Sequence, residues 1–150
     1  MSILRCESLA RSYLSGGREI TVLTDITFDL EAGGFLAVTG PSGSGKSTLL
    51  RLLGFIERPF EGQILFKGRP AEPFSEDVRF QVTLLPQDPY IMKRSVFKNI
   101  AYGLDLRGDR SFARRRVHEA MAMVGLSPDT FAQRPWSALS GGEAQRVALA

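Results

Sequence analysis

The sequence contains one cysteine and one histidine in 150 residues. The single cysteine, Cys6, excludes an internal disulfide, and we expect it to be a small buried side chain in a chain from a reducing compartment. No apolar run approaches the roughly 18–20 residues that span a bilayer. Residues 1–7 also lack the apolar segment of a secretory signal. These absences predict a chain that stays in the cytoplasm.

The sequence also has only a small excess of basic over acidic residues. The 19 basic and 16 acidic residues leave a net charge of +3, which is weak support for binding to nucleic acid or lipid. We therefore expect no nucleic-acid partner. The only dense basic run, residues 114–116, has helical spacing and predicts a solvated helix face. His118 lies in the same region and is interpreted as an ordinary helix-surface residue.

Four segments have the patterns of strands. Apolar and polar residues alternate in the second half of residues 20–30, which is the period of a half-buried strand. Residues 35–39 form an almost unbroken apolar run, as in a buried parallel strand. Residues 62–68 and 80–85 predict two further strands.

Helical spacing is first found at residues 49–53, directly after a glycine-rich loop. It returns in residues 96–104 and 112–124. A last helix begins near Gly141, and its pattern is still running at Ala150. Because the chain stops within a helical pattern, we interpret it as a fragment.

The order of these elements predicts an α/β chain that forms one partial domain. Residues 1–88 would be the strand-rich part with the glycine-rich loop. Residues 89–138 would be a helical insert, and residues 139–150 would begin the last helix.

The glycine-rich loop lies between a predicted strand and a predicted helix, the context in which such loops bind phosphates. Its glycines let backbone N–H groups and the helix N-terminus face a triphosphate. Lys46 is placed to reach the β- and γ-phosphates, Ser47 to bind Mg²⁺ and Thr48 to lie near the α-phosphate. We therefore predict a site for Mg²⁺ and a nucleoside triphosphate, with ATP the expected nucleotide. The loop residues are Gly40, Pro41, Ser42, Gly43, Ser44, Gly45, Lys46, Ser47 and Thr48.

The last predicted helix begins with a second glycine-containing segment, residues 139–146. Ser140 can cap this helix, and Glu143 stands three residues later, as in a capping box. Gly141 and Gly142 are unfavourable in a first helical turn, which makes sense if another molecule approaches the backbone there. From these residues alone, an ordinary capped helix and an anion site are equally good interpretations.

Together with the loop, residues 139–146 resemble the signature sequence of ATP-binding cassette (ABC) ATPases. Gln87 is similar to the Q-loop glutamine of this family, because it follows an apolar strand and precedes a helical insert. Tyr13, about 27 residues before Gly40, resembles the aromatic residue that stacks on adenine. The resemblance covers the whole chain, with the motifs in the family's order.

This resemblance implies a P-loop NTPase fold of the ABC ATPase type. Its parts would be an N-terminal antiparallel β-subdomain, an incomplete RecA-like core and a helical subdomain. Two copies would bind ATP and Mg²⁺ between them in a head-to-tail dimer. Lys46 and Gln87 would be catalytic, with Gln87 contacting Mg²⁺ or the attacking water. The implied cofactor-binding residues of the signature are Ser140, Gly141, Gly142, Glu143 and Gln145.

The other implied partners are transmembrane permease subunits that contact the helical subdomain. The protein would then lie on the cytoplasmic face of the inner membrane. Residues 95–104 resemble importer ATPases, including tungstate- and phosphate-type systems. We therefore expect an ATPase subunit that powers a bacterial importer.

One departure from the family bears on hydrolysis. The family also needs an apolar strand that ends in Asp, a catalytic Glu and a later switch His, and none is found after the loop. We expect these parts beyond Ala150. The 150 residues should then bind nucleotide without hydrolysing it competently, and a strand missing from the middle of the sheet should leave apolar surface uncovered.

Two other function classes stay open. One is a soluble ABC ATPase of DNA repair or translation, although the repair type carries a long coiled coil where this chain has only 51 residues between Gln87 and Leu139. The other is a non-catalytic, nucleotide-dependent interaction module. An apolar strand ending in Asp-Glu after Ala150 would support an ATPase.

Overall fold

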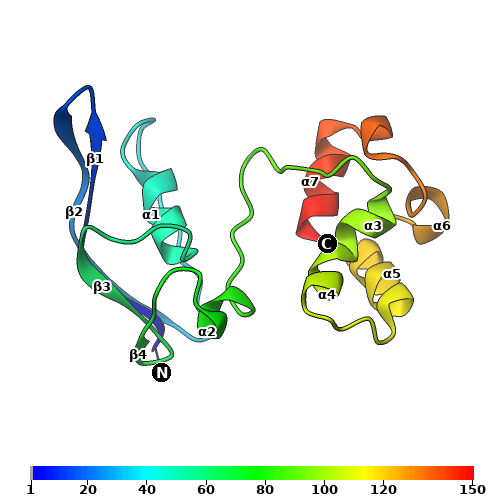
Figure 1. Ribbon diagram of the computed structural model, residues 1–150, viewed down its shortest axis with the longest axis horizontal. Coiled ribbons are helices and arrows are strands. Elements are labelled where there is room, and N and C mark those ends of the chain that lie inside the picture. Colours follow the sequence, from blue (N-terminus) through cyan, green and yellow to red (C-terminus); the bar gives the residue numbers. More distant parts are fainter. Residues whose placement is uncertain (1) are drawn as a thin grey trace. The chain divides into compact units, whose positions relative to one another are not determined.

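The computed structural model describes residues 2–150, apart from the side chain of Asp77. The chain divides into two compact units, one ending at Leu84 and one running from Leu85 to Ala150. Figure 1 shows the strands of the first unit in blue to green and the helices of the second unit in green to red.

The first unit contains an antiparallel sheet with the strand order β2-β1-β3-β4. Cys6 on β1 pairs with Phe28 on β2 and with Ile64 on β3. The strands predicted in residues 20–30 and 62–68 are therefore confirmed. The strands are β1 (Ser2–Ser15), β2 (Arg18–Glu31), β3 (Glu61–Phe66) and β4 (Arg69–Pro70).

Two helices complete the first unit, α1 (Lys46–Leu53) and the short α2 (Glu76–Arg79). The predicted helix after the glycine-rich loop is thus confirmed. Burial and the nearby charge of Asp29 raise the pKa of the Cys6 thiol to about 12, so Cys6 is the buried residue that the sequence predicted. The buried core residues of this unit are Leu4, Cys6, Leu9, Leu23, Leu49, Leu52, Phe55, Ile64, Phe66 and Val78.

Two predicted strands are not formed. Residues 35–39 and 80–85 belong to no strand of the described chain. Phe35 is 92% exposed and Phe80 is 42% exposed. An apolar run forms a buried strand only where neighbouring strands supply its hydrogen bonds, and among residues 2–150 neither run has such a neighbour. Both strand predictions are wrong for this structure, while the expected uncovered apolar surface is found at these residues.

The second unit consists of short helices around a core of its own. The helices predicted in residues 112–124 and from Gly141 are confirmed. Residues 96–104 contain parts of two helices, which are separated by a turn at Ala101. The elements are α3 (Val96–Ile100), α4 (Tyr102–Leu106), α5 (Ala113–Met123), α6 (Pro128–Phe131), a 3₁₀ helix (Trp136–Ala138) and α7 (Gly141–Leu149). Their buried residues are Val96, Ala101, Val117, Met121, Leu126, Ala132 and Val147.

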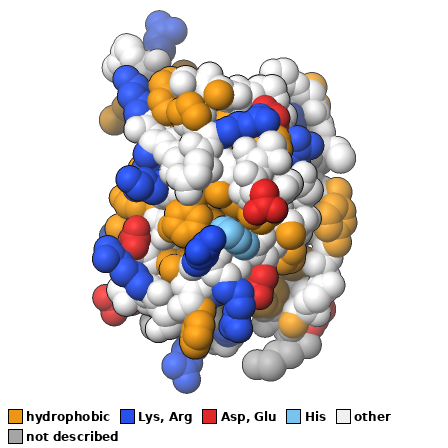
Figure 2. All heavy atoms as spheres, turned by 90° about the vertical axis from the view of Figure 1, so that its right-hand side faces the viewer, with side chains coloured by type: hydrophobic (Ala, Val, Ile, Leu, Met, Phe, Trp, Pro, Cys, Tyr) orange, Lys and Arg blue, Asp and Glu red, His pale blue; other side chains and the backbone are white. Residues whose placement is uncertain are grey.

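The basic run at residues 114–116 lies on a mixed, solvated face. Arg115 pairs with Glu119 at 3.5 Å and Arg116 with Asp109 at 2.5 Å. Figure 2 shows Lys and Arg side chains scattered among acidic and apolar ones on one face of the molecule, without a continuous basic patch. His118 is half-buried, with its ring 6.1 Å from that of Phe97, so it is not a plain surface residue. Within residues 2–150, every helix is too short or too polar to span a bilayer.

Candidate functional site

The glycine-rich loop at residues 40–45 leads into the N-terminus of α1. Gly45 has φ = 86°, a conformation that side chains disfavour. A β-carbon there would lie 2.9 Å from Leu23 Cδ2 and 3.1 Å from Val22 O on β2. β2 therefore packs against the start of α1 at Gly45. Residues 40–44 of the loop are exposed.

The N-terminus of α1 carries no side-chain cap and no acidic residue in its first turn. The backbone N–H groups of a first helical turn have no partner within the helix, and the helix dipole is positive at this end. Ser47 adds an exposed hydroxyl in the same turn. This end of α1 therefore has the properties of an anion-binding site.

Lys46 lies across the loop. Its Nζ donates hydrogen bonds to Gly40 O at 2.9 Å and to Pro41 O at 2.7 Å. The ammonium group is thus held beside the exposed backbone of the loop, where phosphate oxygens can replace the two carbonyl acceptors. Gly40 has φ = 147°, a conformation that side chains disfavour, so the loop backbone requires glycine at this position.

A magnesium ion would find few protein ligands here. Among the described residues, no three His, Cys, Asp or Glu side chains come together in a way that could hold a metal. Mg²⁺ in nucleotide sites takes many of its ligands from phosphate oxygens and water. The Ser47 hydroxyl at the phosphate-binding end of α1 fits such a site.

Tyr13, the predicted adenine-stacking residue, lies on β1 in the same unit as the loop. It is half-buried and pairs with Ile20 across the sheet. Its hydroxyl donates a hydrogen bond of 2.5 Å to Glu57 Oε2. The guanidinium carbon of Arg11 lies 4.6 Å from the centre of its ring. Sequence motifs did not point to either residue; Arg11 lies two residues before Tyr13 on the same strand, whereas only the fold brings Glu57 to Tyr13.

The second predicted site, at the start of α7, lies in the second unit. Ser140 N donates to Glu143 Oε2 at 2.7 Å, and Glu143 N donates to Ser140 Oγ at 3.3 Å. The predicted capping box is therefore confirmed. The hydrogen bond from the Ser140 backbone is the main reason that the pKa of the Glu143 carboxyl is lowered; the Ser140 side chain contributes next, and Arg134 and Arg146 add to the effect.

The two glycines of this turn are not needed by the chain itself. Neither Gly141 nor Gly142 has a positive φ. A β-carbon on either residue would meet no atom within 4 Å. Packing and backbone strain within the chain therefore do not explain why these positions lack side chains.

Gln87 lies beside the signature segment in the second unit. Gln145 Nε2 donates a hydrogen bond of 3.4 Å to Gln87 O, so the structure brings together two motifs that are 58 residues apart in the sequence. Gln87 itself is exposed. Its neighbour in this contact, Gln145, thus points toward the chain's own backbone.

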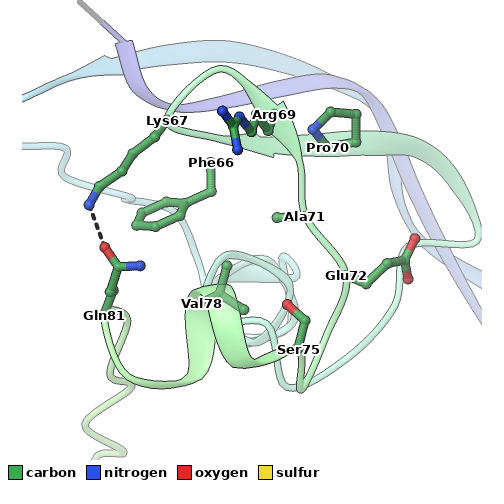
Figure 3. A pocket seen from close by; sticks show the side chains of 9 residues that line it. All are labelled: Phe66, Lys67, Arg69, Pro70, Ala71, Glu72, Ser75, Val78 and Gln81. Atoms are coloured by element: carbon green, nitrogen blue, oxygen red, sulfur yellow. Dashed lines mark hydrogen bonds between the residues drawn. The ribbon is translucent and has the colours of Figure 1, made fainter.

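A hollow of about 450 Å³ in the first unit lies between the β3–β4 turn and α2 (Figure 3). Lys67 and Gln81 are joined by a hydrogen bond at one side of it. Phe66 and Val78 contribute apolar surface. None of the sequence-predicted site residues lines this hollow, so it is separate from the phosphate loop.

Comparison with known proteins gives consistent results. The model of a family described as ABC transporter matches residues 23–150. The lipoprotein-releasing system ATP-binding protein LolD of Idiomarina loihiensis is 38% identical over 99% of this chain and 68% of its own length. The tungstate uptake system ATP-binding protein TupC of Peptoclostridium acidaminophilum is 39% identical over 95% of this chain and 63% of its own length. The chain thus spans about two thirds of the length of these relatives.

The fold matches that of a solved ABC protein. The dimeric structure of the ATP-binding cassette MJ0796, bound to ADP and Pi, superimposes with a TM-score of 0.87 and is 28% identical. The match covers 97% of this chain and 67% of that chain. The predicted P-loop NTPase fold of the ABC type is therefore confirmed, and the chain belongs to the ABC transporter family.

Proposed function

We propose that this chain binds ATP and Mg²⁺ through the loop at residues 40–48 and Tyr13. The observation that carries the proposal is the start of α1, which lacks a cap of its own and is supported from behind by β2. Lys46 would give its two hydrogen bonds to phosphate oxygens, and Ser47 would ligate Mg²⁺. When bound, the ion would neutralise charge on the phosphates.

A second copy of the protein completes the proposed site. The open space around Gly141 and Gly142 would receive the γ-phosphate of an ATP held by the loop of the partner copy. The dimeric state of MJ0796 supports such an assembly. Ser140, Glu143 and Gln145 would belong to the same surface, and Gln87 would contact Mg²⁺ or the attacking water.

The complete protein would be an ATPase that powers a membrane transporter. The relatives are named as ATP-binding proteins of transport systems, which favours this function over a soluble repair or translation ATPase. Hydrolysis would need the Asp, Glu and His that the family places after the signature helix. The helical subdomain would contact permease subunits on the cytoplasmic face of the inner membrane.

Import is the direction we propose. The resemblance of residues 95–104 to importer ATPases and the similarity to a tungstate uptake protein support it. Lipoprotein release is a second candidate, which the similarity to LolD favours. The permease that co-purifies with the complete protein would separate the two.

The central test is the substitution Lys46→Ala in the complete protein. Loss of two charge-assisted hydrogen bonds to phosphate should weaken ATP binding at least about tenfold and abolish turnover. Calorimetry and a phosphate-release assay measure the two effects. Lys98→Ala removes an exposed lysine of α3 in the second unit and should leave both unchanged. Unchanged ATP binding in Lys46→Ala would refute our assignment of the loop.

A further inference from the structure

One carboxylate connects the predicted base-binding strand with the phosphate-binding helix. Glu57 lies just beyond the C-terminus of α1, and its side chain is only 21% exposed. It accepts the hydroxyl hydrogen bond of Tyr13 on β1. It also pairs with Arg11 on β1 at 3.5 Å and with Arg51 on α1 at 3.6 Å. Three side chains from two elements thus meet at Glu57.

The same cluster restrains the ring of Tyr13 from two directions. Its hydroxyl is tied to Glu57, and the Arg11 guanidinium covers one face of the ring in a cation–π contact. An aromatic base can then stack only on the opposite face. A ring fixed in this way loses little conformational freedom when a base binds.

Arg11 depends on Glu57 for its place over the ring. Its Nε atom is buried and has no hydrogen-bond partner among the described residues. This atom lies 3.5 Å from Glu57 Oε2, so the charge of Glu57 offsets the free-energy cost of removing the guanidinium from water. A partly buried guanidinium without a nearby carboxylate is unfavourable. If the charge of Glu57 were removed, Arg11 would move toward water and release the Tyr13 ring.

We propose that Glu57 and Arg11 are positioning residues that hold Tyr13 ready to stack on the base of ATP. The inference rests on the proposed function, because it takes Tyr13 as the base-binding residue. Through Arg51 on α1, the cluster also ties Tyr13 to the helix that begins at the phosphate loop. Because Arg51 lies in the last turn of α1 and the phosphate loop precedes the first turn, Glu57 should control recognition of the base and not that of the phosphates.

The experiment compares two ligands of the complete protein in the presence of Mg²⁺. ATP has a base, whereas inorganic tripolyphosphate offers only the phosphates. Glu57→Gln removes the charge but keeps a hydrogen-bond acceptor, and should raise the Kd for ATP about threefold and leave that for tripolyphosphate unchanged. Tyr13→Ala should raise the Kd for ATP about tenfold. The double variant should bind ATP no more weakly than Tyr13→Ala, because both changes act through one ring.

A matched control is Glu72→Gln, which breaks an exposed ion pair with Arg58 away from Tyr13 and should change neither Kd. Arg11→Lys supplies a second variant if Glu57→Gln does not fold. It keeps the charge but loses the flat guanidinium, and the same selective loss of ATP binding is expected.

Three results would overturn the inference. Equal weakening of both ligands by Glu57→Gln would mean that Glu57 acts through the loop or the fold. A normal ATP Kd in Glu57→Gln and Arg11→Lys, with weak binding in Tyr13→Ala, would remove the positioning role and leave the stacking role intact. A normal ATP Kd in Tyr13→Ala would show that Tyr13 does not bind the base, whereas the Lys46→Ala test of the phosphate loop would be unaffected.

Discussion

The starts of α1 and α7 both combine glycines with a predicted phosphate contact, yet they differ in capping. The N-cap residue of α1 is Gly45, which is left-handed and provides no side-chain cap. The N-cap residue of α7 is Ser140, which forms a complete capping box. The first turn of α1 contains Lys46, whereas that of α7 contains the carboxylate of Glu143.

The glycines at the two helix starts are explained in different ways. At α1, the backbone conformation and the nearness of β2 require Gly45 within the chain itself. At α7, nothing in the chain requires Gly141 or Gly142. The first site is therefore shaped by its own fold and has no acidic residue or side-chain cap of its own, while the second is already capped and offers only a surface that another molecule can approach closely.

The largest expected effect is at α1. Gly45→Ala would place a β-carbon against Val22 O in a disfavoured conformation, which should displace the loop and lower ATPase activity of the complete protein on the order of a hundredfold. Gly68→Ala, in the β3–β4 turn outside the loop, is the matched control, because φ is 78° but a β-carbon would meet nothing within 4 Å. It should carry only the backbone cost of about 1–2 kcal/mol. Equal kinetic losses in the two variants would argue against support from β2.

At α7 the effects on stability and function should have opposite signs. Gly142→Ala should increase the free energy of unfolding by about 0.5 kcal/mol, because alanine restricts the unfolded chain and fits here without strain. It should also weaken ATP-dependent association of two copies, since the β-carbon would occupy the approach path. Denaturant unfolding and analytical ultracentrifugation with ATP measure the two effects.

Gly103→Ala in α4 is the control for this prediction. Gly103 also lacks a positive φ, and its β-carbon would meet no atom within 4 Å. It should stabilise the protein similarly and leave association unchanged. If Gly142→Ala also left association unchanged, no ligand would approach α7 at this residue.

The smallest expected effect is the pH dependence of the α7 cap. The pKa of Glu143 is lowered from its ordinary value of 4.5 on folding, so its ionised form stabilises the folded state above pH 4.5 and that contribution is lost as the pH falls below it. Glu143→Gln should therefore flatten the fall in unfolding free energy between pH 5 and pH 3. Ser140→Ala should cost about 1 kcal/mol at neutral pH and should flatten this fall less than Glu143→Gln, because the Ser140 hydroxyl is only one of the groups that lower the pKa of Glu143. If the free energy of unfolding fell equally with pH in Glu143→Gln and in the unsubstituted protein, the ionised Glu143 would not stabilise the fold.

Local patterns predicted much of the fold correctly. The helix after the loop, the capping box and the strand at residues 62–68 depend on neighbours a few positions away, so the sequence carries their signals. The apolar runs at residues 35–39 and 80–85 did not form strands, because strand formation depends on partners distant in the sequence. Glu57 was missed for the same reason, since it meets Tyr13 across 44 residues.

The sequence by itself determined the ABC family and the two helix starts, because both are encoded in short runs of glycine, hydroxyl and charged residues. Only the tertiary structure decided which glycines the chain needs and which side chains surround Tyr13. The physical reason is that steric room and ion pairing depend on atoms brought together by folding. At Gly45 those atoms belong to β2, and at Tyr13 they belong to Glu57 beyond α1.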